Sequence, residues 1–95
     1  MSRLVITYDI GTDRHSQARL REVTRVLEGY GERVQYSVFE VAATPEVEAT
    51  IKAHLRSVID PKTDSVRIYR VTGHIETVGA HRRYAEPGSL IPLSR

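Results

Sequence analysis

The chain has 95 residues, with 14 basic and 12 acidic side chains, a formal net charge of +2 and no cysteine. This length accommodates one domain core, and the lack of cysteine excludes a disulfide scaffold, a thiolate metal site and a cysteine nucleophile. No segment has the apolar length of a signal peptide or a membrane span, so we expect a cytoplasmic protein with no membrane partner.

Arginine dominates the basic residues, because only Lys52 and Lys62 among the 14 are lysines. Its planar guanidinium suits bidentate contacts with phosphate. The overall charge balance fits an ordinary solvated surface equally well, so arginine content supports a nucleic-acid partner only together with the positions of the arginines.

The first expected element is a strand over residues 4–8, a β-branched and aromatic run that ends at Asp9. Apolar residues occur at both odd and even positions of the strand, so we expect both faces of this strand to be covered. A helix follows, capped by Thr12 or Asp13 and ending at Gly29 or Gly31. Its apolar positions repeat at intervals of three and four residues: Leu20, Val23, Val26, Leu27 and Tyr30. The opposite, basic side of the helix carries Arg14, Arg21 and Arg25.

The rest of the chain predicts more strands and a second helix. Residues 33–41 indicate two short strands or one kinked strand, with the bend near Ser37. Thr44 and Pro45 start a helix that ends at Asp60. Residues 64–71 form another expected strand, and 75–79 a short further one. Residues from about 80 to 95 have the composition of an extended tail with a small apolar patch at Leu90 and Ile91.

The order βαββαβ predicts one α+β domain over residues 1–95 with the ferredoxin-like fold, an antiparallel sheet with both helices on one face. The other face lacks cover inside one chain, and a second copy is the simplest partner. We therefore expect a homodimer. We hypothesise that the tail, with Leu90 and Ile91, extends to the edge of the neighbour's sheet and pairs with its exposed backbone groups.

Asp9 is the main candidate functional residue, because a carboxylate at the end of a strand sits on a rigid element. One carboxylate is a poor magnesium site, but a two-fold axis nearby would bring a second Asp9 to the same ion. The alternative is that Asp9 only caps a turn.

Two motifs together resemble one known family. Tyr8-Asp9-Ile10 closes the first strand, and Tyr30-Gly31 is followed by a string from Arg33 to Glu40, Arg-Val-Gln-Tyr-Ser-Val-Phe-Glu. The chain is similar to the CRISPR-associated endonuclease of the spacer-acquisition machinery, the Cas-two family. The resemblance implies a symmetric homodimer, a phosphodiesterase acting on RNA or DNA with Mg²⁺ or Mn²⁺, and partnership with the Cas-one integrase.

The resemblance also assigns residues by position. Asp9 matches the catalytic and metal-binding aspartate. Arg19 and Arg21 match the basic start of the helix, and Arg33 and Phe39 match the second motif. With Tyr8 and the other arginines of the basic helix face, Arg14 and Arg25, these are the residues expected to bind nucleic acid. The stretch from Asp9 to Tyr30 is about one helical turn longer than is usual in that family, so the role of its helix arginine falls to Arg14, Arg19 or Arg21. Gly11 and Thr12 replace a common proline or acid, which leaves Asp13 as the nearest second carboxylate.

Three functions from different classes fit these residues. The first is a metal-dependent endonuclease, and the second is a non-catalytic dimer that positions duplex DNA for the Cas-one integrase through backbone contacts. The third, an RNA-binding module with aromatic residues on an open sheet, is disfavoured because the RNP1 pattern is absent. Tyr36 and Phe39 suit base stacking, but strand aromatics more often pack in cores or interfaces. The histidines have no ligand-like spacing, and the Arg82-Arg83 pair suits either phosphate or a solvated loop.

Overall fold

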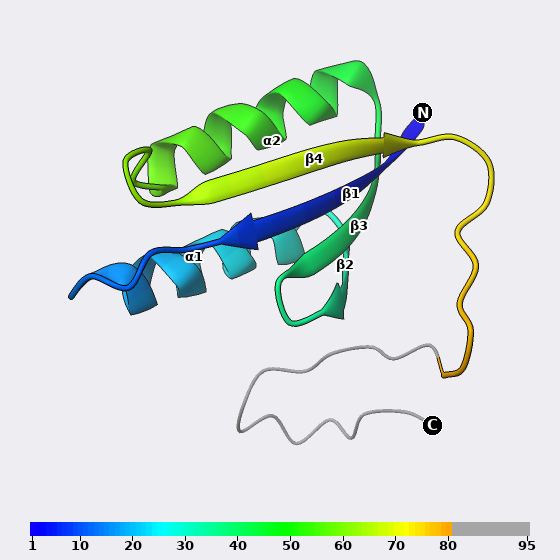
Figure 1. Cartoon of the computed structure of the whole chain (residues 1–95). Coiled ribbons are helices and arrows are strands. Elements are labelled where there is room, and N and C mark those ends of the chain that lie inside the picture. The colour runs from blue at the N-terminus through cyan, green and yellow to red at the C-terminus, as the bar shows by residue number, and fades with distance from the viewer. Residues whose placement is uncertain (81–95) are drawn as a thin grey trace.

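The computed structural model describes residues 1–80, which form a four-stranded antiparallel sheet and two helices (Figure 1). The elements are β1 (Ser2–Asp9), α1 (Ser16–Glu28), β2 (Glu32–Gln35), β3 (Val38–Ala43), α2 (Pro45–Val58) and β4 (Ser65–Val71). The strands lie in the order β2-β3-β1-β4, and every neighbouring pair is antiparallel. This is the strand order of the ferredoxin-like fold, so the predicted fold class is confirmed.

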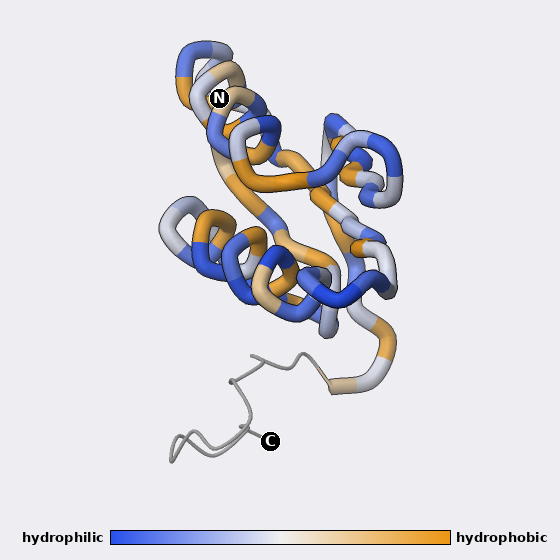
Figure 2. The backbone as a smooth tube through the Cα atoms, turned by 90° about the vertical axis from the view of Figure 1, so that its left-hand side faces the viewer, coloured by the Kyte–Doolittle hydropathy of each residue, from blue (hydrophilic) through white to orange (hydrophobic). Residues whose placement is uncertain are grey.

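The core lies between the sheet and the helices. Leu4, Ile6 and Tyr8 alternate along β1 and are buried, so they share one face of the sheet. The helix residues packed in the same core are Val23, Val26, Leu27, Ile51 and Leu55. Both helices therefore cover the same face, and their coils alternate between hydrophobic and hydrophilic segments (Figure 2).

The opposite face of the sheet has no cover within the described part of the chain. Val5 and Thr7 are half-buried on this face, and the Tyr69 ring beside Val5 is 46% exposed. Within one chain, the expectation that both faces of β1 are covered is therefore confirmed only for the face that packs against the helices. The open sheet face expected from the topology is present.

The start of α2 is as predicted, whereas α1 begins later. Thr44 Oγ1 accepts the N–H of Val47 at 3.2 Å, and proline stands in the first turn. Asp13 instead accepts the N–H of His15 at 3.0 Å and caps the turn before α1, which begins at Ser16 without a side-chain cap. The Asp13 carboxylate is also held by Arg19 of α1, at 2.6 Å.

Gly31 explains why a Tyr-Gly pair follows α1. A Cβ atom at this position would collide with the carbonyl oxygen of Glu40 and the side chain of Val41. The chain leaving α1 therefore passes directly against β3, and only glycine allows that approach.

The remaining strand predictions have mixed outcomes. The predicted bend is confirmed, because Tyr36 and Ser37 form the turn between β2 and β3. The short further strand expected at 75–79 is wrong, since these residues pair with no strand of the described chain. Gly73 has a φ of 83°, which turns the chain after β4 away from the sheet. Arg82, Arg83 and the apolar patch of the expected tail lie outside the described residues.

Candidate functional site

Asp9 is the last residue of β1, and its side chain is exposed. It lies opposite Ser65, the first residue of β4, in the antiparallel ladder. Within residues 1–80 its carboxylate forms no hydrogen bond or ion pair, so the turn-capping alternative receives no support from the geometry. The strand end places a free carboxylate on a rigid part of the sheet.

A hollow of about 420 Å³ opens beside Asp9. It lies between the segment that joins β1 to α1, the first turns of α1 and the turn between β2 and β3. Polar side chains on its wall include Thr12, Gln17 and Ser37, and Leu20 supplies an apolar surface. No arginine or lysine of residues 1–80 lines the hollow, so within this region a phosphate near Asp9 would be neutralised by groups outside its wall.

Tyr8 connects this site to the core. Its ring is 5% exposed, and its hydroxyl shares a hydrogen bond of 2.9 Å with Thr24 of α1. The Tyr8 N–H donates to the carbonyl of Ser37 at 3.2 Å, which ties the end of β1 to the hairpin turn. Burial raises the pKa of the Tyr8 phenol above its usual value, which favours its neutral, hydrogen-bonding form. These contacts give Tyr8 a structural role, while its contact with nucleic acid stays a prediction for a residue on the wall of the hollow.

Arg33 and Phe39 pair across β2 and β3, and both face the helix side. Phe39 is fully buried, so its ring is a core residue here. Arg33 is 8% exposed; its Nε donates to the Tyr36 carbonyl at 2.8 Å, and its guanidinium lies 5.0 Å from the centre of the Tyr36 ring. Arg33 therefore braces the hairpin turn, while Tyr36, 59% exposed, is the aromatic ring of this motif available to a base.

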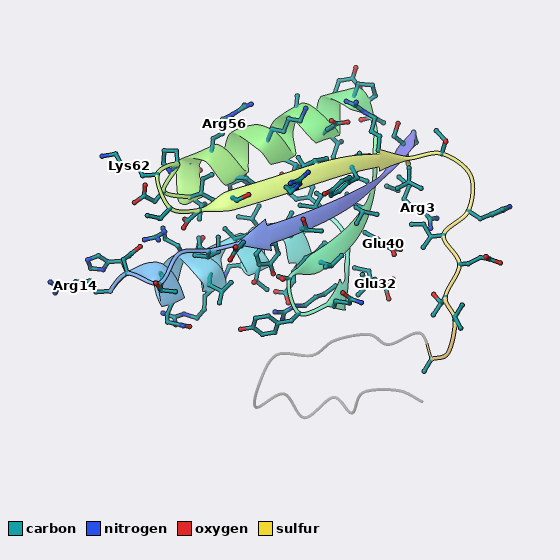
Figure 3. All side chains as sticks on the ribbon, in the orientation of Figure 1. Arg3, Arg14, Glu32, Glu40, Arg56 and Lys62 are labelled. Atoms are coloured by element: carbon teal, nitrogen blue, oxygen red, sulfur yellow. The ribbon has the colours of Figure 1, made fainter. Side chains whose placement is uncertain are left out.

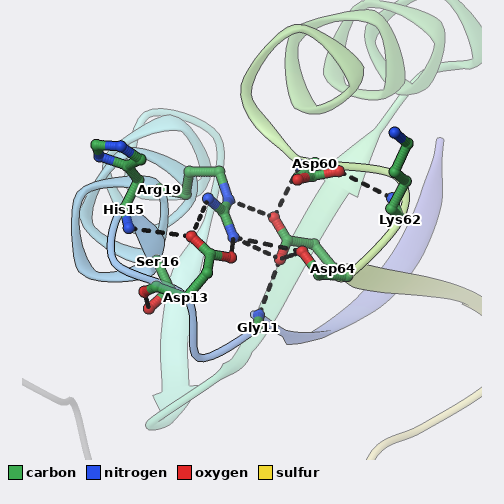
Figure 4. A network of polar contacts seen from close by, with 9 residues as sticks. Gly11, Asp13, His15, Ser16, Arg19, Asp60, Lys62 and Asp64 are labelled. Carbon is green, nitrogen blue, oxygen red and sulfur yellow. Dashed lines mark hydrogen bonds and ion pairs between the residues drawn. The ribbon is translucent and has the colours of Figure 1, made fainter.

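Arg19 belongs to a network of ion pairs at the start of α1 (Figure 4). Its Nη1 and Nη2 donate to the two oxygens of Asp13 at 3.0 and 2.6 Å, and its Nε donates to Asp64 at 2.8 Å. The Arg19 hydrogen bonds lower the pKa of Asp13 to about 2 and hold the pKa of Asp64 well below its usual range. All three guanidinium nitrogens of Arg19 are thus engaged within the chain, which leaves little of this arginine for phosphate.

Three other predicted arginines reach solvent. Arg21 and Arg25 project from α1, and Arg25 pairs with Glu22 at 2.7 Å. Arg14 lies before the helix, at the outer end of the turn after β1, where its side chain points away from the molecule (Figure 3). Among the candidate helix arginines, Arg14 and Arg21 therefore have the freest side chains.

The described residues contain no group of three or more histidine, aspartate or glutamate side chains close enough to hold a metal ion. Asp13, the nearest second carboxylate by sequence, is neutralised by Arg19 at 2.6 Å and is not available as a ligand. Asp9 supplies a carboxylate, the kind of oxygen donor that Mg²⁺ prefers. A second Asp9 from another copy, with water or phosphate oxygens, would complete such a site.

Sequence reasoning missed Asp64 and Thr24. Asp64 stands at the start of β4, beside the end of β1, and its side chain is completely buried. The antiparallel topology was the available signal, since it brings the residue before β4 next to the residues after β1. Nothing local in the sequence distinguishes Asp64 from an exposed loop aspartate.

Residues 1–76 match the family model for CRISPR associated protein Cas2. The chain belongs to the Cas2 family. The resemblance drawn from the two sequence motifs is therefore confirmed.

Cas2 proteins of other organisms align over most of this chain. A CRISPR-associated endoribonuclease Cas2 of Rhodospirillum rubrum is 38% identical, over 93% of this chain and 98% of the relative. A CRISPR-associated endonuclease Cas2 of Halalkalibacterium halodurans is 39% identical over 82% of each chain. The crystal structure of Streptococcus pyogenes Cas2 at pH 6.5 superposes with a TM-score of 0.70 and 41% identity, over 81% of this chain and 99% of that chain.

Neither helix of the described region is long and apolar enough to cross a bilayer. The Cas2 relatives are named for nucleases, and the names differ in whether they specify RNA.

Proposed function

We propose that this Cas2 protein is a metal-dependent endonuclease that cleaves phosphodiester bonds of RNA or DNA as a symmetric homodimer. The observation that carries the proposal is the Asp9 carboxylate, which is exposed at the end of β1, free of partners within residues 1–80 and beside a hollow. The nuclease names of the Cas2 relatives support it independently.

Asp9 would act with the same residue of the second copy. One chain supplies a single free carboxylate at this point, so two chains related by a two-fold axis would supply two. Such a pair fits Mg²⁺ or Mn²⁺, which when bound polarises the phosphodiester and lowers the pKa of an attacking water. Arg14 and Arg21, which are exposed near the start of α1, would bind phosphates on either side of the scissile bond.

The homodimer itself is part of the proposal, and the open sheet face supports it. Val5, Thr7 and Tyr69 of this face would gain burial against a second copy. β4 is an edge strand, so its outer backbone groups are free to pair with another chain. The tail from residue 81 would be that chain if it crosses to the partner; it lies outside the described residues.

The proposal is tested by cleavage assays on single-stranded RNA, single-stranded DNA and duplex DNA, each with Mg²⁺, Mn²⁺ or a chelator. Asp9→Asn keeps the size of the side chain and removes its charge, so it should abolish metal-dependent cleavage and spare dimerisation. Glu46→Gln, at an exposed position in the first turn of α2, is the matched control and should cleave normally. Full activity of Asp9→Asn would reject Asp9 as a metal ligand.

A second candidate function is a non-catalytic dimer that positions duplex DNA for the Cas-one integrase. The observation that favours it is the pairing of Asp13 with Arg19, which leaves one free carboxylate per chain at the site. Exposed arginines contact DNA backbone equally well in a scaffold. Metal-independent DNA binding without cleavage of any of the three substrates by the unmodified protein would favour this function over the nuclease.

A further inference from the structure

Five hydrogen bonds converge on the Asp64 carboxylate. Although charged, it is completely buried. One carboxylate oxygen accepts from the Gly11 N–H at 2.8 Å and from Thr63 Oγ1 at 3.1 Å, and the other accepts from the Asp60 N–H at 2.8 Å. Arg19 donates to both oxygens, at 2.8 and 3.2 Å. The buried charge is thus fully compensated.

These bonds join three separate parts of the fold (Figure 4). Gly11 belongs to the segment after β1, Arg19 to the first turns of α1, and Asp60 to the loop after α2. Packing reinforces them, because a Cβ atom on Gly11 would lie 2.9 Å from the Cβ of Thr63. The two loops therefore pack closely against each other, and Asp64 holds them together.

Asp9 borders this network on two sides. Along the chain it stands two residues before Gly11, whose amide Asp64 binds. Across the sheet its ladder partner is Ser65, the residue that follows Asp64. A change at Asp64 would move both neighbours of Asp9, and an error of about 1 Å in a functional group is enough to cost roughly 100-fold in rate.

We propose that Asp64 and Arg19 are positioning residues for Asp9, holding the end of β1 and the segment after it in the geometry that metal binding needs. The proposal rests on the proposed function in one respect, that Asp9 is the metal ligand. In this proposal Arg19 differs from the exposed Arg14 and Arg21. Arg19 holds the end of β1 in position, whereas Arg14 and Arg21 bind phosphate.

Asp64→Asn tests the proposal, because its amide group would point N–H donors at the donors of Arg19 or Asp60. The first readout is the order of the Gly11 amide by ¹⁵N relaxation, which needs neither metal nor substrate. We expect its order parameter to fall from about 0.85 to below roughly 0.6. The second is Mn²⁺ binding by electron paramagnetic resonance, which should weaken by about 10–100-fold, as typically found when partners of metal ligands are altered.

Glu48→Gln is the matched control. Glu48 is also a buried acid, paired with Arg70 at 2.7 Å, but Arg70 lies opposite Leu4, near the other end of β1. This variant should lower the melting temperature yet leave the order of Gly11 and the affinity for Mn²⁺ unchanged. Equal effects of Glu48→Gln and Asp64→Asn on Mn²⁺ affinity would show a merely structural role and overturn the proposal.

Arg19→Lys keeps the positive charge but loses the planar group that contacts Asp13 and Asp64 together. It should weaken Mn²⁺ binding, and it should add little further loss when combined with Asp64→Asn, because the two residues act as a unit. Additive effects would overturn that coupling. If the unmodified protein neither binds Mn²⁺ nor cleaves, the proposed function fails; a rigid Gly11 in Asp64→Asn would independently refute the positioning role.

Discussion

The hydroxyls of Tyr8 and Thr24 lie 2.9 Å apart and join the last buried position of β1 to the middle of α1. Tyr8 is thus the last core residue of β1, next to the exposed Asp9. The alternation along the strand places one residue among the helices and the next in solvent.

Tyr8→Phe should reduce the free energy of unfolding by about 1 kcal/mol, because it removes a buried hydrogen bond and leaves Thr24 without that partner. Urea denaturation measures this loss. Thr24→Val should cost a similar amount, and the double variant should cost less than the sum of the two. Nucleic-acid binding of Tyr8→Phe should match the unmodified protein; a large loss of binding with the fold intact would restore a direct role for the Tyr8 hydroxyl.

The strand end that holds Asp9 was predictable because it depends on local pattern. A β-branched run closed by Asp and Gly indicates a strand, and the turn at Ser37 and the start at Thr44 have equally local signals. The roles of Arg19 and Asp64 were not predictable, since these residues stand 45 positions apart and meet only through the sheet topology. Local signals also failed at 75–79, where the expected short strand pairs with no strand of the described chain.

Acid should unfold the protein through Asp13 and Asp64. Both carboxyls have a lower pKa in the folded chain than the usual 3.8, so their stabilising effect is fully present above about pH 5 and declines as the pH falls through the folded values, about 2 for Asp13. The free energy of unfolding, measured by urea titration between pH 6 and pH 2, should decrease over this range.

Asp13→Asn is the variant for this pH dependence, because it removes one of the two titrating groups and should flatten the decline. Glu46→Gln, whose carboxylate is exposed, serves as the control and should keep the slope of the unmodified protein. An unchanged slope in Asp13→Asn would mean that its pairing with Arg19 is not maintained in solution.

The exposed arginines should carry the salt dependence of nucleic-acid binding. Replacing Arg14 and Arg21 with glutamine should weaken duplex DNA binding and reduce the slope of log K against log salt by about 0.9 for each phosphate that the variant no longer neutralises. Adding Arg25→Gln should have a smaller effect, because Arg25 is already paired with Glu22 at 2.7 Å. Filter binding or fluorescence anisotropy across salt concentrations gives these slopes.

Arg56 and Lys62 provide a charge-matched control for that double variant. Arg56 projects from α2 and Lys62 from the loop after it (Figure 3). Replacing them removes the same number of positive charges from a part of the surface away from α1. Their replacement by glutamine should change the slope little. Equal slopes for the two double variants would mean that overall charge, not the arginines near α1, determines binding.

The open sheet face should determine the oligomeric state. Sedimentation equilibrium at micromolar concentration should give twice the 10.7 kDa mass of the chain. Tyr69→Glu replaces a ring that is 46% exposed in one chain with a carboxylate beside Arg67, and should shift the protein to monomer because an interface loses the apolar ring and must bury a charged group. Val47→Glu, at a position 36% exposed on α2, is the control and should remain dimeric.

A monomeric Tyr69→Glu variant should also lose any metal binding that needs two Asp9 carboxylates. A dimer that survives Tyr69→Glu but not Val47→Glu would place the interface on the helices and not on the sheet.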